Sequence, residues 1–324
     1  MGANLVHELC HQGHEVVVLV RPQSDLVTLE GLPCEKVVGS LEEVGALKRA
    51  MLGCQWCFHV AASYHLWLPD YRPMYEANVG GTRRVIEIAM EAGCERIVYT
   101  STVGCIGLPK AKDGTYCPTN ETDVPDGAQL TNHYKRSKWQ AEQVALEFAR
   151  DGAPLVVVNP STPIGPRDAK PTPTGKVVLD FLNRELPGYL ETGLNWVHVR
   201  DVAIGHILAA ERGRVGERYI LGNAQGNLRM LDALKILEEI TGLKAPRLRV
   251  PYPAAWAAAV ISEGLAKLTG VPPKAPMAGV RMAKYWMWFD PGKAIRELNM
   301  PQTPVSEAFS DAVDWFRENG YVRT

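Results

Sequence analysis

Apolar runs and helix-like patterns alternate through the first half of the chain. The apolar runs cover residues 14–20, 35–38, 55–61, 96–100 and 154–159. Helical patterns occupy residues 3–11, 41–52, 71–92 and 129–150. The runs are apolar throughout, which is typical of strands covered by helices on both faces. This order predicts an α/β fold with a doubly wound parallel sheet.

The rhythm changes after about residue 165. Prolines at positions 163, 166, 171 and 173 predict a loop. Helical patterns follow at residues 201–212, 229–241, 253–268 and 306–318, with short strand candidates at 196–199 and 218–221. We therefore expect a smaller, mostly helical region beside the sheet.

Charge and cysteine content exclude several classes of protein. The 324 residues carry a formal net charge of −1, so no basic field recruits nucleic acid. Seven irregularly spaced cysteines argue against a disulfide framework. Cys54 and Cys57 lack the second pair that a zinc site needs, so we expect no metal. Without a signal peptide or a run of ~18 apolar residues, we expect a cytoplasmic protein with no stable membrane insertion.

Tyr134 and Lys138 are four residues apart in a helical pattern and so share one helix face. A free tyrosine has a pKa of about 10. A nearby ammonium is expected to favour the phenolate and to lower that pKa. Such a pair can move a proton to or from a substrate oxygen. The alternative is a surface lysine packed on a tyrosine, because this spacing also arises by chance.

Hydroxyl side chains close the apolar run that precedes this helix. Thr100, Ser101 and Thr102 follow one another there. Side chains at the carboxyl end of a strand face the ligand crevice of an open α/β sheet. One of these hydroxyls is therefore expected to hydrogen-bond the substrate oxygen that Tyr134 protonates, although a polar strand end without function is the alternative.

Three further segments share their order and spacing with a known superfamily. They are residues 58–62 (Phe-His-Val-Ala-Ala), 78–82 (Asn-Val-Gly-Gly-Thr) and 197–203 (Val-His-Val-Arg-Asp-Val-Ala). With the Tyr-Lys pair they resemble the extended short-chain dehydrogenase/reductase superfamily, including its NAD-dependent epimerase/dehydratase family, from Gly2 to Tyr321. The resemblance implies a Rossmann-like fold in which Thr102, Tyr134 and Lys138 are catalytic.

The resemblance also implies how the chain is divided. Residues 1–166, with about 195–222, are expected to form an NADP-binding Rossmann-like domain. Residues 167–194 and 223–324 are expected to bind a small-molecule substrate. The residues expected to contact the cofactor are Gly2, Arg21, Ser40, Leu41, Ala61, Ala62, Asn78, Thr100, Tyr134, Lys138 and Pro160.

The glycine-rich turn of this superfamily is incomplete here. Gly2 matches its last glycine, whereas the preceding strand and the other two glycines are absent. That strand would lie mid-sheet, between the runs at 14–20 and 55–61, and its loss would leave unpaired backbone groups in the core. We expect the natural chain to begin about a dozen residues upstream. The alternative is that the shorter chain is genuine and binds cofactor poorly.

The choice of cofactor depends on the residue after the second strand of this fold. An acidic residue there binds the ribose of NAD, whereas an arginine suits the 2′-phosphate of NADP. This chain has Arg21 and no acid, which predicts NADP, with NAD as the alternative. An exposed arginine that merely begins a loop would look the same. Ser40 stands where the family usually has an aspartate for the adenine.

The substrate is less well defined. Thr162 replaces an asparagine of the nucleotide-sugar epimerases, which argues against such an enzyme, while Pro160 and Arg21 resemble the dihydroflavonol reductase branch. Residues 62–67 and 171–176 resemble the hopanoid-associated sugar epimerases. A family name does not determine the chemistry. The residues expected to contact substrate are Tyr64, His65, Lys176 and Arg281.

Three functions therefore remain open. The first is an NADP-dependent reductase or dehydrogenase in which Tyr134 is the acid/base. The second is a sugar epimerase or dehydratase with a tightly bound nicotinamide cofactor. The third is a non-catalytic nucleotide-binding protein, favoured if the short N-terminus is genuine. The resemblance suggests a homodimer formed through the helices of 71–92 and 129–150.

Two apolar segments of the C-terminal region have more than one interpretation. Residues 254–268 are rich in alanine and could touch a membrane surface. They contain little positive charge, so we expect them to pack on the domain core. The aromatic cluster at residues 285–289 either lines an apolar pocket or belongs to the core.

Overall fold

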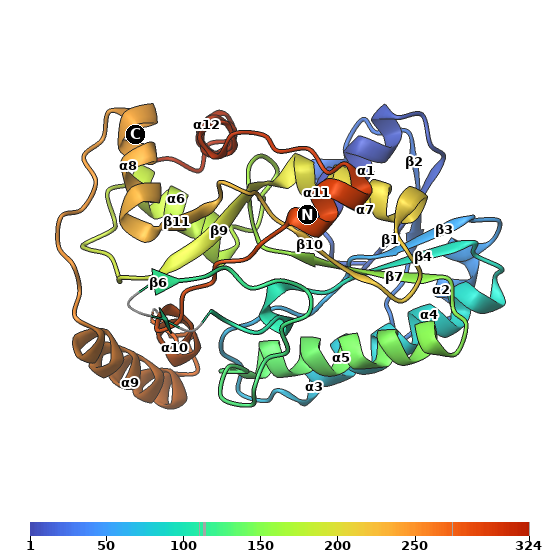
Figure 1. Cartoon of the computed structure of the whole chain (residues 1–324), viewed down its shortest axis with the longest axis horizontal. Coiled ribbons are helices and arrows are strands. Elements are labelled where there is room, and N and C mark those ends of the chain that lie inside the picture. The colour runs from blue at the N-terminus through green and yellow to red at the C-terminus, as the bar shows by residue number, and fades with distance from the viewer. Residues whose placement is uncertain (110, 113–114, 274, 324) are drawn as a thin grey trace.

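A computed structural model describes residues 1–109, 111–112, 115–273 and 275–323 (Figure 1). Its central layer is a parallel sheet with the strand order β10-β7-β4-β3. These strands are β3 (Trp56–His59), β4 (Arg96–Thr100), β7 (Leu155–Pro160) and β10 (Arg218–Leu221). A second parallel pair consists of β1 (Val16–Val20) and β2 (Cys34–Val38). The predicted doubly wound α/β fold is confirmed.

Helices cover both faces of the sheet, as the uninterrupted apolar strands predict. The helices on one face are α2 (Val44–Met51), α4 (Gly81–Glu91) and α5 (His133–Arg150), and those on the other are α1 (Gly2–His11), α7 (Val199–Arg212) and α11 (Gly292–Leu298) (Figure 1). In β4, Ile97 and Tyr99 belong to the core under α4 and α5, whereas Val98 packs in the core with Val202 of α7. Each strand is therefore buried from both sides.

The chain between β3 and α4 is helical without interruption from α3 (Arg72–Tyr75). The π-helical turn Glu76–Gly80 joins α3 to α4, and the backbone stays in the right-handed helical region at both junctions. A π-helical turn inside an α-helix often marks a functional site. Asn78 lies in this turn and is 1% exposed.

Among the described residues, no strand lies between β1 and β3. β1 is paired with β2, and β3 with β4. Leu5 and Leu9 of α1 pack against Val16 and Phe58, so α1 contacts the start of β1 and the body of β3. The expectation of a further strand at this place stays a prediction.

A smaller sheet with the order β11-β9-β8 lies beside the first one. Its strands are β8 (Thr162–Ile164), β9 (Gly193–His198) and β11 (Asn227–Arg229). The helices packed on it are α6 (Pro173–Leu182), α8 (Met230–Thr241) and α12 (Val305–Glu318). β5 (Ala111–Lys112) and β6 (Thr115–Tyr116) form a short hairpin (Figure 1).

The helix α6 corrects the prediction of a loop around the clustered prolines. Pro173 occupies the first turn of α6, where the missing N–H of proline leaves no helical hydrogen bond unmade. Thr172 caps the helix by accepting a hydrogen bond from the backbone N–H of Gly175 at 3.1 Å. The last of the clustered prolines, Pro173, therefore begins a helix. The number of prolines around it had predicted a loop instead.

β9 belongs to two cores at once. Its Trp196 packs with Phe309 at a ring-centroid distance of 5.1 Å in the core of the smaller sheet. The next residue, Val197, faces the opposite way and packs with Val158 and Val202 in the core of the larger sheet. The predicted boundaries of the two domains thus stay a prediction, because one strand serves both.

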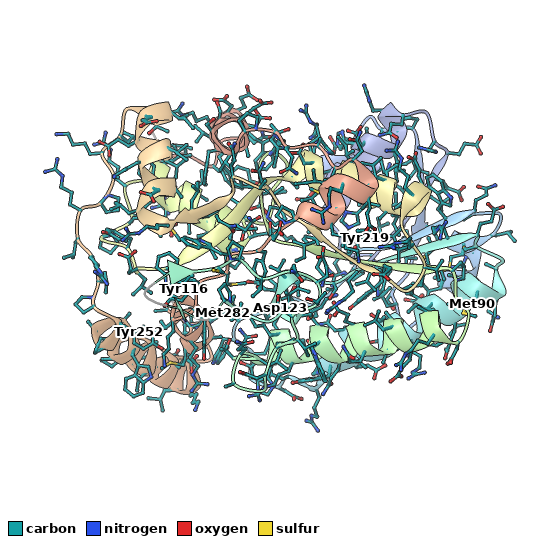
Figure 2. All side chains as sticks on the ribbon, viewed as in Figure 1. Met90, Tyr116, Asp123, Tyr219, Tyr252 and Met282 are labelled. Atoms are coloured by element: carbon teal, nitrogen blue, oxygen red, sulfur yellow. The ribbon has the colours of Figure 1, made fainter. Side chains whose placement is uncertain are left out.

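The helix α9 (Tyr252–Thr269) contradicts the expectation that it packs on the domain core. Along its 18 residues, Ala259 and Ala266 are the buried positions. The element that contacts it most is α10 (Met277–Ala283), at the lower left of Figure 1. Figure 2 shows Tyr252 at the start of this helix, away from Tyr219 and the larger sheet.

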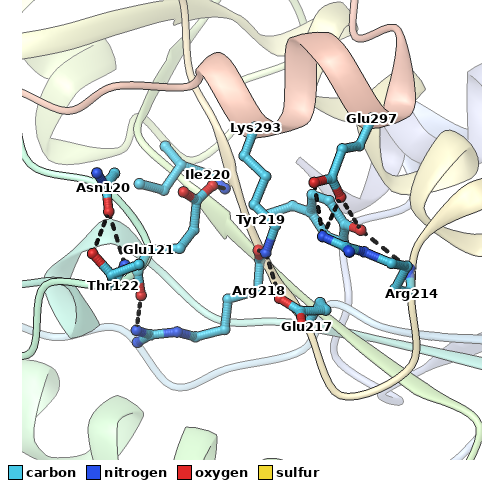
Figure 3. Close-up of polar contacts among 10 residues, drawn as sticks. All are labelled: Asn120, Glu121, Thr122, Arg214, Glu217, Arg218, Tyr219, Ile220, Lys293 and Glu297. Atoms are coloured by element: carbon cyan, nitrogen blue, oxygen red, sulfur yellow. Dashed lines mark hydrogen bonds and ion pairs between the residues drawn. The ribbon is translucent and has the colours of Figure 1, made fainter.

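A buried ion pair joins α5 to β10. Glu142 is 0% exposed and accepts hydrogen bonds from Arg218 at 3.1 Å and from Asn159 at 2.7 Å. Arg218 also donates to the backbone carbonyl of Glu121, whose own carboxylate accepts the N–H of Ile220 at 2.8 Å (Figure 3). This buried pair therefore holds α5, the edge strand β10 and the loop around residue 121 together.

The outer part of this network reaches the surface, although Tyr219 is buried and the Lys293 side chain is 17% exposed. Lys293 of α11 donates to Glu217 at 2.6 Å, and Glu297 accepts from Arg214 at 2.7 Å and from Tyr219 at 2.9 Å (Figure 3). Arg214 and Glu217 are largely in solvent, where such pairs contribute little to stability. We therefore expect the buried Glu142 to contribute most of the stability that this network provides.

Candidate active site

The first turn of α5 places the predicted tyrosine at the carboxyl edge of the sheet. Asn132 caps α5 by accepting a hydrogen bond from the N–H of Lys135 at 2.8 Å. The helix starts at His133, later than predicted, because the Gln129 side chain is bonded to the backbone of Leu108 instead. Tyr134 and Lys138 therefore occupy the first two turns, next to the end of β4.

Thr102 and Tyr134 lie together at this edge. Burial raises the pKa of Tyr134 above its ordinary value, and the neighbouring Tyr64 and Cys105 raise it further. A hydrogen bond with the Thr102 side chain opposes this rise in the pKa of Tyr134. Thr102 also accepts a hydrogen bond from the N–H of Gly104 at 3.1 Å, which holds the turn Val103–Cys105. The two side chains thus lie next to each other, and their catalytic role stays a prediction.

The Lys138 side chain ends at the carboxyl end of β4, beside Thr100 and Tyr99. Its ammonium donates to the carbonyl oxygen of Thr100 at 2.8 Å and lies 4.5 Å from the centre of the Tyr99 ring. Burial lowers the pKa of Lys138 to about 8, against the opposing effects of Cys105 and Glu142. Our expectation that Lys138 lowers the pKa of Tyr134 is wrong for this arrangement, since burial of the phenol outweighs the nearby ammonium.

Asn78 connects the two walls of the site. Its side-chain oxygen accepts the N–H of Ser63 at 2.7 Å. Its amide nitrogen donates to the carbonyl of Ser63 at 3.0 Å and to the hydroxyl of Ser137 at 2.9 Å. Both amide protons are thereby used. Asn78 consequently positions the segment after β3 against α5, and only the second lone pair of its side-chain oxygen is left to accept a bond from a cofactor.

Two buried histidines support the site in their neutral form. His206 hydrogen-bonds the carbonyl of Val202 at 2.7 Å and the hydroxyl of Thr100 at 2.9 Å. Burial lowers the pKa of His206 to about 4 and that of His59 to about 3. The Thr100 side chain thus points at His206 of α7. Its backbone carbonyl accepts a hydrogen bond from Lys138. The cofactor contact predicted for Thr100 stays a prediction.

The remaining residues predicted to contact cofactor follow the ends of the strands. Gly2 starts α1 within 4.0 Å of Val60 when a Cβ is placed on it, and the first turn of α1 contains no acidic residue. Arg21 is exposed directly after β1. The others line the same edge: Ala61 and Ala62 are exposed after β3, Pro160 is buried at the end of β7, Ser40 accepts the N–H of Glu42 at 3.3 Å, and Leu41 packs against Gly81.

This edge suits an anionic dinucleotide. The N-terminal end of a helix attracts negative charge through its free N–H groups, and no acid opposes that attraction in α1. Arg21 adds a mobile cation at the end of the neighbouring strand. The donor groups present therefore fit the phosphates of a nicotinamide dinucleotide.

The residues predicted to contact substrate are placed differently from one another. The Tyr64 ring meets the Tyr134 ring edge-on at a centroid distance of 4.3 Å, and burial raises the pKa of Tyr64 to about 12. His65 is exposed beside it. Lys176 is engaged with Asp180 of α6 at 2.6 Å, and Arg281 is exposed on α10. The structure brings Tyr64 to Tyr134 and shows no such contact for the other three among the described residues.

Lys135 is a buried group that the sequence reasoning missed. It is 2% exposed, and its ammonium has no hydrogen bond or ion pair among the described residues. Burial lowers the pKa of Lys135 to about 8. Nearby, Thr131 and Asn132 present a hydroxyl and an amide nitrogen that are buried without a partner. The sequence contains no signal for this, because Lys135 and Arg136 look alike beside Tyr134.

The aromatic cluster at residues 285–289 is divided between core and surface. Met287 and Phe289 are buried in a core with Val103 and Ile220. Trp286 stacks on Tyr116 at 5.2 Å and lines a pocket together with Tyr252 and Lys284. Both interpretations of this cluster therefore apply, to alternate residues.

A family model and a curated relative both match most of this chain. The model described as "NAD dependent epimerase/dehydratase family" matches residues 1–222. A "Putative dihydroflavonol 4-reductase" of Synechocystis sp. is 45% identical over 328 residues, covering 100% of this chain and 94% of that protein.

Two solved structures cover nearly the whole chain. The structure of gox2253 has 42% sequence identity and a TM-score of 0.85, and it covers 99% of this chain and 96% of its own. The structure of PA4631 from Pseudomonas aeruginosa, described as a nucleoside-diphosphate-sugar epimerase, has 27% identity and a TM-score of 0.78, with 99% and 95% covered. The fold is therefore shared along nearly the whole chain.

Proposed function

The chain belongs to the NAD dependent epimerase/dehydratase family of extended short-chain dehydrogenases/reductases, and from that premise we propose that it is an NADP-dependent carbonyl reductase or alcohol dehydrogenase. The observation that supports this proposal most is that the Tyr134 phenol lies beside the Thr102 side chain, one helical turn before Lys138, whose ammonium binds the carbonyl of Thr100. A reductase relative at 45% identity favours net redox chemistry over epimerisation.

In the proposed mechanism, the two hydroxyl groups bind the substrate carbonyl oxygen. NADPH, when bound, supplies the hydride that adds to the carbonyl carbon. Tyr134 gives its proton to the oxygen, so that hydride and proton together yield the alcohol. Because burial keeps the pKa of Tyr134 high, the phenol is fully protonated at neutral pH and able to act as this donor.

Lys138 stabilises the phenolate that remains after this transfer. Its pKa of about 8 leaves it largely charged at neutral pH. An ammonium fixed by the carbonyl of Thr100 lies in a low-dielectric environment, where its attraction for a developing negative charge is strong. Lys138 thus acts on the charge that appears during the reaction, and not on the resting phenol.

A sugar epimerase or dehydratase is the second candidate. The likeness to PA4631 favours it, since that protein is described as a nucleoside-diphosphate-sugar epimerase. Thr162 in place of the asparagine of such enzymes favours the reductase. The two candidates differ in whether free cofactor is consumed.

The two candidates can be separated by measuring cofactor turnover. We expect multiple turnovers of NADPH, followed at its absorbance maximum, with at least one member of a panel of ketones and aldehydes. An isomerised sugar with no net change in cofactor would select the epimerase instead. Thr102→Val serves as a control for adventitious reduction, because it removes a hydroxyl that the reaction requires.

Arg21 is expected to select NADP over NAD. Arg21→Gln should raise the KM for NADPH about 10- to 100-fold and leave that for NADH nearly unchanged, since a charge-assisted bond to phosphate contributes about 1.5–3 kcal/mol. Lys36→Gln is the matched control, because Lys36 is an exposed cation on the adjacent strand β2. Equal losses with both cofactors would show that Arg21 does not read the 2′-phosphate.

The remaining expectations stay predictions. A homodimer would use α4 and α5, which pack against each other on one face of the sheet. Small-molecule substrate contacts by His65, Lys176 and Arg281 would need these side chains to turn toward Tyr134.

A further inference from the structure

Helix α9 exposes an apolar surface that no part of the described chain covers. The side chains of Trp256, Val260, Ile261, Leu265 and Leu268 are between 44% and 86% exposed. Soluble proteins rarely leave so many large apolar side chains together in solvent. We call this set of five residues the apolar face of α9.

The apolar face occupies one side of the helix. At 100° per residue these five positions fall within half of the helix circumference. The opposite side is fixed to the segment before α10 and to its first residue: Ser262 accepts the N–H of Ala275 at 3.3 Å, and Glu263 accepts the N–H of Met277 at 2.8 Å. The hydrogen bonds of Ser262 and Glu263 therefore set the rotation of α9 about its axis, and they leave the apolar face pointing outward.

Exposed cations lie on α9, on or directly after its neighbour α10, and in the segment before α9, where Arg249 is paired with Glu191 at 3.7 Å. Within residues 243–284 the one acidic residue is Glu263, which is turned toward α10. The described basic side chains in this stretch are exposed: Lys244, Arg247, Arg249, Lys267, Arg281 and Lys284. The whole chain has a net charge of −1, so this cationic concentration is local.

We propose that α9 and its basic flanks dock the protein on the surface of an anionic lipid bilayer, with the apolar face in the interface between headgroups and acyl chains. A helix with exposed apolar residues and neighbouring lysines and arginines suits such a position. Exposed basic groups near an anionic membrane add electrostatic attraction to burial of the apolar side chains. No described helix is long and apolar enough to cross a membrane, so the contact is peripheral.

A second copy of the chain is a poorer occupant of this surface. A two-fold interface would bring the same residues of both copies together. Exposed cations such as Lys267, Arg281 and Lys284 would then be present on both sides of the interface, and like charges across an interface oppose association. Anionic lipid instead complements every one of these cations.

The proposal is tested by sedimentation of the full chain with vesicles. We expect the protein to sediment with vesicles of phosphatidylcholine and phosphatidylglycerol, more weakly as salt is raised, and hardly with pure phosphatidylcholine. Ile261→Asp with Leu265→Asp should lower the partition coefficient about a hundredfold, because burial of two large apolar side chains is lost. Leu52→Asp is the matched control, since Leu52 is 84% exposed at the end of α2.

Charge removal tests the second part of the proposal. Lys267→Gln, Arg281→Gln and Lys284→Gln together should weaken binding to the anionic vesicles about a hundredfold, at roughly fivefold for each charge. Far-UV circular dichroism and the unfolding midpoint show that each variant is folded. Binding that ignores lipid charge, no binding to either vesicle, or a dimer in solution that Ile261→Asp dissociates would overturn the proposal. None of these readouts depends on the reaction proposed for Tyr134.

Discussion

Tyr134→Phe is expected to lower kcat by about 10²- to 10⁴-fold and to leave nucleotide affinity unchanged. The substitution removes the proton donor, and general acid catalysis contributes about this much. The phenylalanine ring keeps the edge-on contact with Tyr64, so the local packing is preserved. NADPH oxidation measures the first quantity, and quenching of protein fluorescence by added nucleotide measures the second.

Tyr75→Phe is the matched control for this experiment. Tyr75 also approaches the first turn of α5, with its hydroxyl 3.2 Å from Nδ1 of His133, and it does not face Thr102. We expect kcat to change less than twofold. Equal activity of the Tyr134→Phe and wild-type enzymes would show that another group protonates the substrate.

Arg218→Met is expected to lower the free energy of unfolding by about 3–5 kcal/mol, because it leaves the buried carboxylate of Glu142 without its cation. Glu142 is 0% exposed in the folded chain, so its carboxylate is held away from solvent. Asn159 would remain as a single neutral donor. Unfolding in urea at neutral pH, followed by circular dichroism, measures the loss.

Two variants separate a lost ion pair from a general defect. Arg214→Met removes an exposed arginine of the same network, whose pair with Glu297 is in solvent, and should have little effect. Glu142→Gln combined with Arg218→Met should recover much of the stability, since the uncompensated charge is gone. Equal destabilisation by Arg218→Met and Arg214→Met would show that burial of Glu142 does not dominate the network.

The sheet could be predicted because its strands are apolar on both sides. Ile97, Val98 and Tyr99 are all 0% exposed, and such a run has few alternatives to a buried parallel strand. Helix α6 could not be predicted, because Pro173 marks a loop as readily as a helix start. The environment of α9 could not be predicted either, since an alanine-rich helix with little amphipathicity does not reveal which side is covered.

The candidate site was predictable in its residues but not in its electrostatics. Spacing placed Tyr134 and Lys138 on one helix face, the resemblance to a known superfamily singled out Thr102, and the roles of all three stay predictions. Neither could show that burial raises the pKa of Tyr134, or that the Lys138 ammonium binds the carbonyl of Thr100. Lys135 is as buried as Lys138, yet nothing in the pattern distinguishes it from the exposed Arg136. Burial depends on distant segments, which a local pattern does not contain.

The three hydrogen bonds of Asn78 constrain how related enzymes can diverge. A single amide joins the segment of Ser63, which continues into Tyr64, to the helix of Tyr134. A substitution that changes substrate preference by moving the Ser63–Tyr64 segment would therefore also move the helix of Tyr134, and so would change the reactivity of Tyr134 at the same time. Helix α10 lies near the neighbouring Leu66, since a Cβ added at Gly279 would come 3.8 Å from its side chain, and no hydrogen bond joins the two among the described residues. Adaptation to new substrates should therefore accumulate on α10 first, where it leaves the chemistry intact.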